Sequence, residues 1–267
     1  MNFNVRQIPN FTNLSEIKAI NWVKNPAPNI NISTSSDTFQ SNLPQRYASE
    51  YMISKLANSN SEIKNILKSA NVPYKLNTDE INNVLHLHGS KTREIAVGIY
   101  DNLPLSIKQT VDKNSLKDAA YLHDIGKVFI PNEILNKAST LTNEEYSIMQ
   151  LHPVLGYELL KNTNLNNKTL FLLKNHHQDM LKSGYPKVEK EFKADNDLQV
   201  LALADRYSAL TEKRPYKDAL SREQALTIIN SEVKLGKFNP LIFNSLVNYT
   251  ATADIANANG KNKNLLL

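Results

Sequence analysis

The most informative part of the sequence is Leu116-Lys-Asp-Ala-Ala-Tyr-Leu-His123-Asp124-Ile-Gly-Lys127. Its apolar residues recur at three- and four-residue spacing, which predicts an amphipathic helix that ends near Asp124. A carboxylate at the apolar end of a helix is costly to bury unless a cation compensates its charge. Histidine and aspartate together supply the nitrogen and oxygen donors that zinc, manganese and iron accept. We therefore interpret His123 and Asp124 as metal ligands rather than as core residues.

On both sides of this stretch the chain reads as a series of helices. Apolar periodicity and capping signals predict helices at residues 46–56, 62–70, 77–100, 115–124, 142–150, 153–160, 168–176, 197–211 and 221–232, and a last helix that starts at Asn239-Pro240. The chain has only 7 glycines and 11 prolines, which disfavours an all-β sandwich with its frequent turns. The predicted fold class is all-α, a helical bundle.

The two ends of the chain differ in composition from the middle. Residues 1–45 are rich in Asn, Ser and Pro and bury too little to offset their ordering entropy, so we expect a mostly irregular N-terminal arm. Residues 46–80 are predicted to form a helical lead-in of unknown role, and residues 81–250 one helical domain. Residues 251–267 read as a polar tail, as irregular as the arm.

Composition also restricts the class of protein. With 0 cysteines the chain has neither disulfides nor thiolate metal sites, which favours a reducing cytoplasm. Its apolar runs are too short to span a membrane and its N-terminus has no signal-peptide core, so we expect a cytoplasmic protein with no membrane segment. A net charge of +5 suits nucleic acid or a small anionic substrate. Because the lysines are scattered, we expect no dedicated nucleic-acid binding.

Two other segments carry ligand-type residues. His176 and His177 are adjacent, and neighbouring helical residues point about 100° apart, so two such imidazoles can approach two ions, or one ion and a phosphate. Asp205 lies in a segment whose inner neighbours are apolar or small. An ion pair with Arg206 is the alternative explanation for Asp205, but consecutive helical residues do not face each other.

In order and spacing these residues resemble the HD superfamily of metal-dependent phosphohydrolases, and in particular its HD-GYP branch, the bacterial cyclic di-GMP phosphodiesterases. The similarity covers about residues 80–250. It is carried by His123-Asp-Ile-Gly-Lys127, by residues 141–156 around His152, by His176-His177, by Ser183-Gly-Tyr-Pro186 and by residues 203–217.

The resemblance implies a centre of two divalent transition-metal ions (Fe, Mn or Zn). Its ligands would be His88, His123, Asp124, His152, His176, His177 and Asp205. Asp124 would bridge the ions, which would share a water, lower its pKa and hold the phosphate for attack. His88 matches the first family histidine better than His86, which we interpret as an ordinary helix residue.

The resemblance also assigns residues to the substrate. Asp124 and Lys127 would be catalytic, and Lys127 would also contact a phosphate or the attacking water. Tyr185 would close the substrate pocket. Arg214 and Lys217 match a pair that contacts phosphate, which suits a guanidinium fork and an ammonium.

The chain departs from the family pattern in the loop after the paired histidines. The family usually has His-His-Glu, two residues, Asp-Gly, one residue and Gly-Tyr-Pro; here Gln178 replaces the glutamate and Leu181-Lys182 replaces Asp-Gly. Losing a carboxylate that orients a metal-bound imidazole typically costs about 10- to 100-fold in affinity or activity. Asp179 is a candidate substitute. Some relatives hold a third ion with a glutamate four residues before the first histidine, where this chain has Val84, so we expect two ions.

Three functions are therefore considered. The first is a phosphodiesterase acting on cyclic di-GMP or a related cyclic dinucleotide. The second is an HD phosphohydrolase of another nucleotide or phosphate ester. The third is a nucleotide-binding signalling module that has lost turnover. The complete ligand set argues against the third function, and Leu181-Lys182 argues for it.

Overall fold

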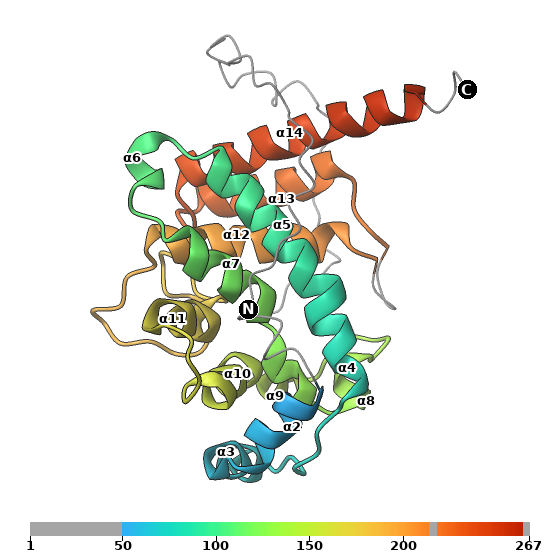
Figure 1. Ribbon diagram of the computed structural model, residues 1–267, viewed down its shortest axis with the longest axis vertical. Coiled ribbons are helices and arrows are strands. Elements are labelled where there is room, and N and C mark those ends of the chain that lie inside the picture. Colours follow the sequence, from blue (N-terminus) through green and yellow to red (C-terminus); the bar gives the residue numbers. More distant parts are fainter. Residues whose placement is uncertain (1–49, 214–217, 264–267) are drawn as a thin grey trace. The chain divides into compact units, whose positions relative to one another are not determined.

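The computed structural model describes residues 50–213 and 218–263, and in these ranges the chain forms helices joined by loops, with no strand (Figure 1). The predicted all-α fold class is confirmed. The irregular arm expected at residues 1–45 lies outside the described residues. Within the described ranges no helix has both the length and the apolarity needed to cross a membrane.

The elements follow one another in a simple order. They are α2 (Glu50–Asn58), α3 (Ser61–Ser69), α4 (Asp79–Ile81), the π-helix η3 (Asn82–Gly89), α5 (Ser90–Asp101), α6 (Leu105–Lys108), α7 (Lys113–Leu122), the 3₁₀-helix η4 (Ile125–Phe129), α8 (Asn132–Leu135), α9 (Asn143–Met149), α10 (His152–Leu160), α11 (Asn167–Asn175), α12 (Asn196–Thr211), α13 (Arg222–Lys234) and α14 (Pro240–Lys263).

Most predicted helices are confirmed to within two or three residues, and both predicted capping boxes form, at Thr142 and at Ser221. The helix predicted over residues 77–100 is instead α4, η3 and α5 in succession, with a π-helical stretch that ends at Gly89. The prediction of an irregular tail from residue 251 was wrong, because α14 continues through Lys263. Alanines between the asparagines of this segment favour a helix.

Two clusters of buried apolar side chains form the core. The first is built by α5, α7, α12, α13 and α14, and the second by α2, α3, η3, η4, α10 and α11. Helix α7 belongs to both, since Leu116 and Ala120 lie in the first cluster and Leu122 in the second. His123 and Asp124, which follow Leu122 directly, are therefore fixed by packing on both sides.

The lead-in segment supports α10. Helices α2 and α3 pack against α10, and Ile53 and Leu67 are fully buried in the second cluster (Figure 1). Asn60 caps the start of α3, and its side-chain amide also donates to the carbonyl of Glu158 on α10 at 2.7 Å. The lead-in thus holds the helix that begins at His152.

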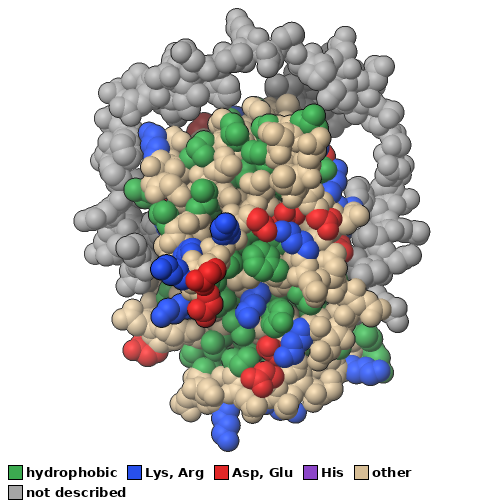
Figure 2. Space-filling model, turned by 90° about the vertical axis from the view of Figure 1, so that its left-hand side faces the viewer, with side chains coloured by type: hydrophobic (Ala, Val, Ile, Leu, Met, Phe, Trp, Pro, Cys, Tyr) green, Lys and Arg blue, Asp and Glu red, His purple; other side chains and the backbone are tan. Residues whose placement is uncertain are grey.

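One described face can be judged directly for charge. On the face drawn in Figure 2, basic and acidic side chains are interspersed among apolar ones. That face therefore presents no basic stripe of the kind that tracks a nucleic-acid backbone.

Two glycines permit close backbone contacts at the end of α7. A Cβ on Gly126 would lie 2.0 Å from the carbonyl oxygen of His152 and 2.6 Å from the amide nitrogen of Gly156, so η4 can lie against α10 only with glycine there. A Cβ on Gly89 would lie 2.4 Å from the carbonyl oxygen of Tyr121, so the same holds for η3 against α7. Each contact brings a histidine-bearing element to the end of α7.

We expect Gly126→Ala to lower the free energy of unfolding by about 1–3 kcal/mol or more, because the added methyl group must push η4 away from α10. Gly156→Ala is the matched control. Its Cβ would come no closer than 3.1 Å to Leu173 Cδ2 and 3.2 Å to the Gly126 amide nitrogen, so η4 would be displaced less and the cost should be smaller. Urea unfolding of both variants measures the difference, and a Gly126 variant as stable as the wild type would contradict this account of the contact.

Candidate metal centre

Three histidines at helix ends share one hydrogen-bond arrangement. The Nδ1 atoms of His123, His152 and His176 each donate to the backbone carbonyl three residues earlier, at 2.7–2.9 Å. A carbonyl only accepts, so in the neutral form of each ring the proton is on Nδ1 and the lone pair is on Nε2. The backbone thereby orients these rings as ligands through Nε2.

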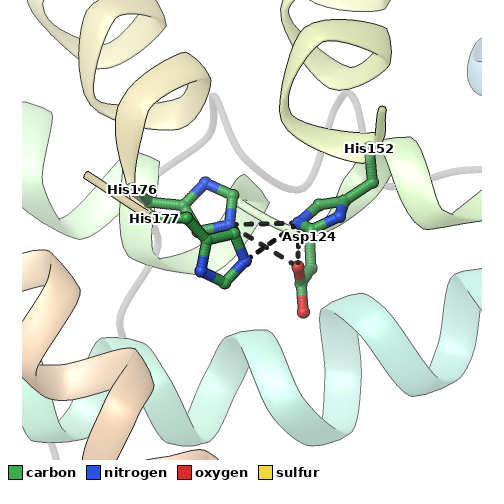
Figure 3. Close-up of side chains that lie close together, drawn as sticks. All are labelled: Asp124, His152, His176 and His177. Carbon is green, nitrogen blue, oxygen red and sulfur yellow. Dashed lines mark hydrogen bonds and ion pairs between the residues drawn. The ribbon is translucent and has the colours of Figure 1, made fainter. Parts of the chain in front are cut away.

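The Nε2 atoms of two of these histidines converge with a third imidazole. His152 Nε2 lies 3.2 Å from His176 Nε2 and 3.2 Å from His177 Nε2. Figure 3 shows the three rings and the Asp124 carboxylate pointing toward one another. Ligand atoms of Asp124, His152, His176 and His177, here called the His152 group, lie within 4.8 Å of one another. Facing lone pairs at this distance repel unless a cation lies between them.

A second group adjoins the first. It consists of His88 from η3, His123 after α7 and Asp205 from α12, and is called the His88 group. His88 Nε2 lies 3.3 Å from His123 Nε2, and Asp205 Oδ1 lies 3.1 Å and 3.5 Å from these two nitrogens. The other oxygen of Asp205, Oδ2, is 3.8 Å from His177 Nδ1, so this carboxylate faces both groups.

Asp124 lies between the groups and turns one oxygen to each. Its Oδ1 is 3.2 Å from His152 Nε2, and its Oδ2 is 3.4 Å from both His88 Nε2 and His123 Nε2. Asp124 is 2% exposed, and its Oδ1 is buried and accepts no hydrogen bond. A buried carboxylate oxygen without a hydrogen bond, facing imidazole lone pairs, fits a cation bound in each group.

Burial keeps the imidazoles of the His152 group neutral. It lowers the pKa of His152, takes that of His176 well below its usual range with help from the neighbouring rings, and takes the pKa of His177 to about 3. His123 differs: burial alone would lower its pKa, but the carboxylates of Asp124 and Asp205 raise it to about 10. In the metal-free protein His123 therefore carries a second proton, on Nε2, where a bound ion would need a lone pair.

Lys127 and Tyr185 complete the wall of the centre. Lys127 Nζ lies 2.5 Å from Asp124 Oδ2 and the side chain is 19% exposed, so it points inward and is not a solvated helix-end lysine. The Tyr185 ring centroid is 4.5 Å from that of His177 and 6.1 Å from that of His152. Burial raises the pKa of Tyr185 well above its usual value, so the phenol stays protonated and able to donate a hydrogen bond.

The altered loop has its own hydrogen bonds. The side-chain amide nitrogen of Gln178, Nε2, donates to the Pro186 carbonyl, a hydrogen bond that the carboxylate of the usual glutamate could not make. Asp179 accepts from the backbone of Leu181 at 2.9 Å and from the hydroxyl of Ser183 at 2.5 Å. Asp179 thus shapes the loop, and in the described part of the chain it bonds no imidazole.

Sequence reasoning missed Glu212. Its Oε2 accepts a hydrogen bond from His88 Nδ1 at 2.9 Å, and Ser208 Oγ donates to its Oε1 at 2.5 Å. Asp205, Ser208 and Glu212 are spaced as residues on one helical face, which was the available signal.

The remaining residues named in the sequence analysis lie outside the two groups or outside the described part of the chain. His86 belongs to neither group, and its Nδ1 lies 3.2 Å from the Tyr121 hydroxyl. Val84 is buried in the second apolar cluster. Arg214 and Lys217, the predicted phosphate contacts, lie outside the described residues.

A family model described as an HD domain matches residues 75–242, more than half of the chain. The chain belongs to the HD-domain family. HD domains are metal-dependent, and the two groups of this HD domain offer side chains that could hold metal. The predicted superfamily is confirmed.

Relatives support the same assignment. A Vibrio cholerae protein named 3'3'-cGAMP-specific phosphodiesterase 1 is 29% identical over 160 residues, which are 60% of this chain and 36% of that protein. A cyclic di-GMP phosphodiesterase of Thermotoga maritima is 33% identical over 148 residues, 55% of this chain and 39% of that protein. The matched stretch therefore spans well under half of either relative.

One solved structure supports the fold. A HDG"Y"P protein from Bdellovibrio bacteriovorus matches this HD domain with a TM-score of 0.52 at 14% identity, over 76% of this chain and 66% of that chain. At this identity the likeness concerns the fold alone.

The pKa shifts predict how the metal-free protein responds to acid. Below about pH 6.5 the unfolded chain protonates His152, His176 and His177, whereas the folded chain does not, because burial lowers their pKa values. The free energy of unfolding should therefore decrease as the pH is lowered, by about 1.4 kcal/mol per pH unit for each such proton. The raised pKa values of His123 and His88 oppose this trend at and above about pH 6.5, but well below that pH both states carry these protons and the three buried imidazoles set the slope.

Thermal unfolding with a chelator present, from about pH 6 down to about pH 5, measures this effect. The melting temperature should fall throughout. A constant or rising melting temperature would mean that these three imidazoles are not held neutral by burial.

Proposed function

We propose that this HD domain is a metal-dependent phosphodiesterase of the HD-GYP kind, which hydrolyses cyclic di-GMP or a related cyclic dinucleotide. The observation that carries the proposal is the Asp124 carboxylate, buried between two groups of converging imidazoles with one oxygen toward each. The relatives named as cyclic dinucleotide phosphodiesterases supply the substrate class.

In this proposal the domain holds two divalent transition-metal ions. The His152 group would hold one and the His88 group the other, with Asp124 serving both. Imidazole and carboxylate donors suit iron, manganese and zinc alike. Bound ions would supply Lewis acidity, which lowers the pKa of a water and offsets charge on the phosphate.

The side chains of the wall would bind and orient the substrate. Lys127 is inward-pointing and 2.5 Å from Asp124, so its ammonium can reach a phosphate oxygen or a water beside that carboxylate. Tyr185 can donate its hydroxyl hydrogen from the aromatic wall over His177. Arg214 and Lys217 keep the phosphate-binding role that the resemblance implies.

The loop supports an active enzyme rather than a module that has lost turnover. Lys182 stands where the family has glycine and has φ 56°, in the left-handed region that favours glycine, so the backbone keeps a glycine-like conformation at this position. Leu181, at the position of the family aspartate, is 54% exposed. The hydrogen bonds of Gln178 and Asp179 support this loop from within, without the family residues.

The metal content tests the centre itself. Anaerobically prepared wild-type protein should contain about two transition-metal ions per chain, as expected for a site of the two-metal type. Asp124→Ala should lose both, because one carboxylate serves each group. Asp179→Ala is the matched control, since Asp179 shapes the loop and bonds no described imidazole, so this variant should keep its metal. Elemental analysis decides, and wild-type protein well below one ion per chain after reconstitution with manganese or iron would refute the centre.

Turnover tests the substrate. We expect the Mn²⁺- or Fe²⁺-loaded protein to hydrolyse cyclic di-GMP or 3'3'-cGAMP. Arg214→Ala should reduce this turnover about 10- to 100-fold without changing metal content, because a charge-assisted bond to phosphate is worth about 1.5–3 kcal/mol. His123→Ala should lose metal and activity together.

Two further assays separate the alternatives. Cleavage of bis(p-nitrophenyl) phosphate without cleavage of any cyclic dinucleotide would leave only the broader phosphohydrolase function. Turnover that appears only after Leu181→Asp with Lys182→Gly would show that the native loop has lost activity.

A further inference from the structure

His88 is held differently from the other helix-end histidines of the centre. His123, His152 and His176 donate from Nδ1 to a neutral backbone carbonyl three residues earlier in the chain. His88 instead donates from Nδ1 to the carboxylate of Glu212 at 2.9 Å, and Glu212 lies 124 positions away in the chain.

One helix therefore contacts both nitrogens of His88. Asp205 of α12 places Oδ1 3.1 Å from Nε2, and Glu212, at the end of the same helix, places Oε2 2.9 Å from Nδ1. The Glu212 carboxylate is fixed in turn. Its backbone N–H donates to the Ser208 carbonyl at 2.9 Å, and the fully buried hydroxyl of Ser208 donates to Oε1 at 2.5 Å.

A carboxylate that accepts from an imidazole N–H fixes the ring orientation and makes the other nitrogen a stronger donor. A backbone carbonyl has the same geometric effect but carries no charge. The His88 group therefore has Asp205 and one oxygen of Asp124 facing its nitrogens, with the Glu212 charge directly behind His88. The His152 group combines three neutral imidazoles with the other oxygen of Asp124 and, at the longer distance of 3.8 Å from His177 Nδ1, with Asp205 Oδ2.

We propose that Glu212 is a positioning residue for His88 and makes the His88 group the tighter of two unequal metal positions, so that ions bind in a fixed order. This rests on the metal centre of the proposed function, but not on the identity of the substrate. Glu212 acts through His88 and touches neither ion nor phosphate.

The test uses the full chain, stripped of metal with a chelator and titrated with Mn²⁺ in a calorimeter. Wild-type protein should show a tight phase and a weaker phase. Glu212→Gln keeps the shape and an acceptor oxygen but removes the charge. It should weaken the tight phase about 10- to 100-fold and leave the weaker phase unchanged.

Two variants serve as controls. Glu80→Gln makes the same change of charge on a partly exposed side chain that accepts a hydrogen bond from Asn83, outside both metal-ligand groups, and it should titrate as wild type. Ser208→Ala keeps the Glu212 charge but removes the hydrogen bond from the Ser208 hydroxyl to Oε1, so it should weaken the tight phase by less than Glu212→Gln does. It also provides the test if the Glu212 variant does not fold, since an unchanged tight phase in Ser208→Ala would then overturn the proposal.

Anomalous diffraction from crystals grown with one equivalent of Mn²⁺ identifies the position that fills first. The ion should lie in the His88 group of the wild type. An ion in the His152 group, or a Glu212→Gln protein that titrates as wild type, overturns the role of Glu212 and leaves the proposed function standing. A wild-type chain that binds no Mn²⁺ overturns both.

Discussion

The structure depends on the burial of one carboxylate. Asp124 is 2% exposed at the junction of the two apolar clusters, where an uncompensated charge would be strongly destabilising. Lys127 and the surrounding imidazoles lower its pKa although burial raises it, so the group stays ionised. Ligand-type side chains therefore surround it. η3 and α12 bring His88 and Asp205 to one side, and α10 and the end of α11 bring His152 and His176 to the other.

Backbone packing makes this convergence possible. Gly126 and Gly89 allow η4 to lie against α10 and η3 against α7 with no side chain between them. Helix ends then provide the carbonyls that orient His123, His152 and His176, so the same groups that end a helix also prepare a ligand. Fold and site are thus parts of one arrangement.

Much of this could be predicted from the sequence. Apolar spacing and capping boxes gave most helices, because both act within a few residues and leave a local signal. Residue type and context singled out His123, Asp124, His176, His177 and Asp205, the resemblance added His88 and His152, and the structure brings all seven into two adjoining groups. Short elements such as η4 and α8 have too few residues to show a period, and the continuation of α14 was hidden by its asparagines.

The rest depended on contacts between distant residues. Glu212 meets His88 only because the fold brings α12 and η3 together, so the helical spacing of Glu212 with Asp205 does not identify His88 as its partner. The same is true of Gln178, whose bond to Pro186 explains an apparent loss as a different way of holding the loop. Departures from a family pattern become interpretable once their partners are known.

In the proposed function, one buried carboxylate, Asp124, joins two adjoining metal positions. Electron paramagnetic resonance of the protein loaded with Mn²⁺ tests it most directly. The wild type should give the spectrum of a spin-coupled pair of ions, and Asp124→Asn should lose that coupling. A wild-type spectrum of isolated, uncoupled Mn²⁺ at full occupancy would contradict the account.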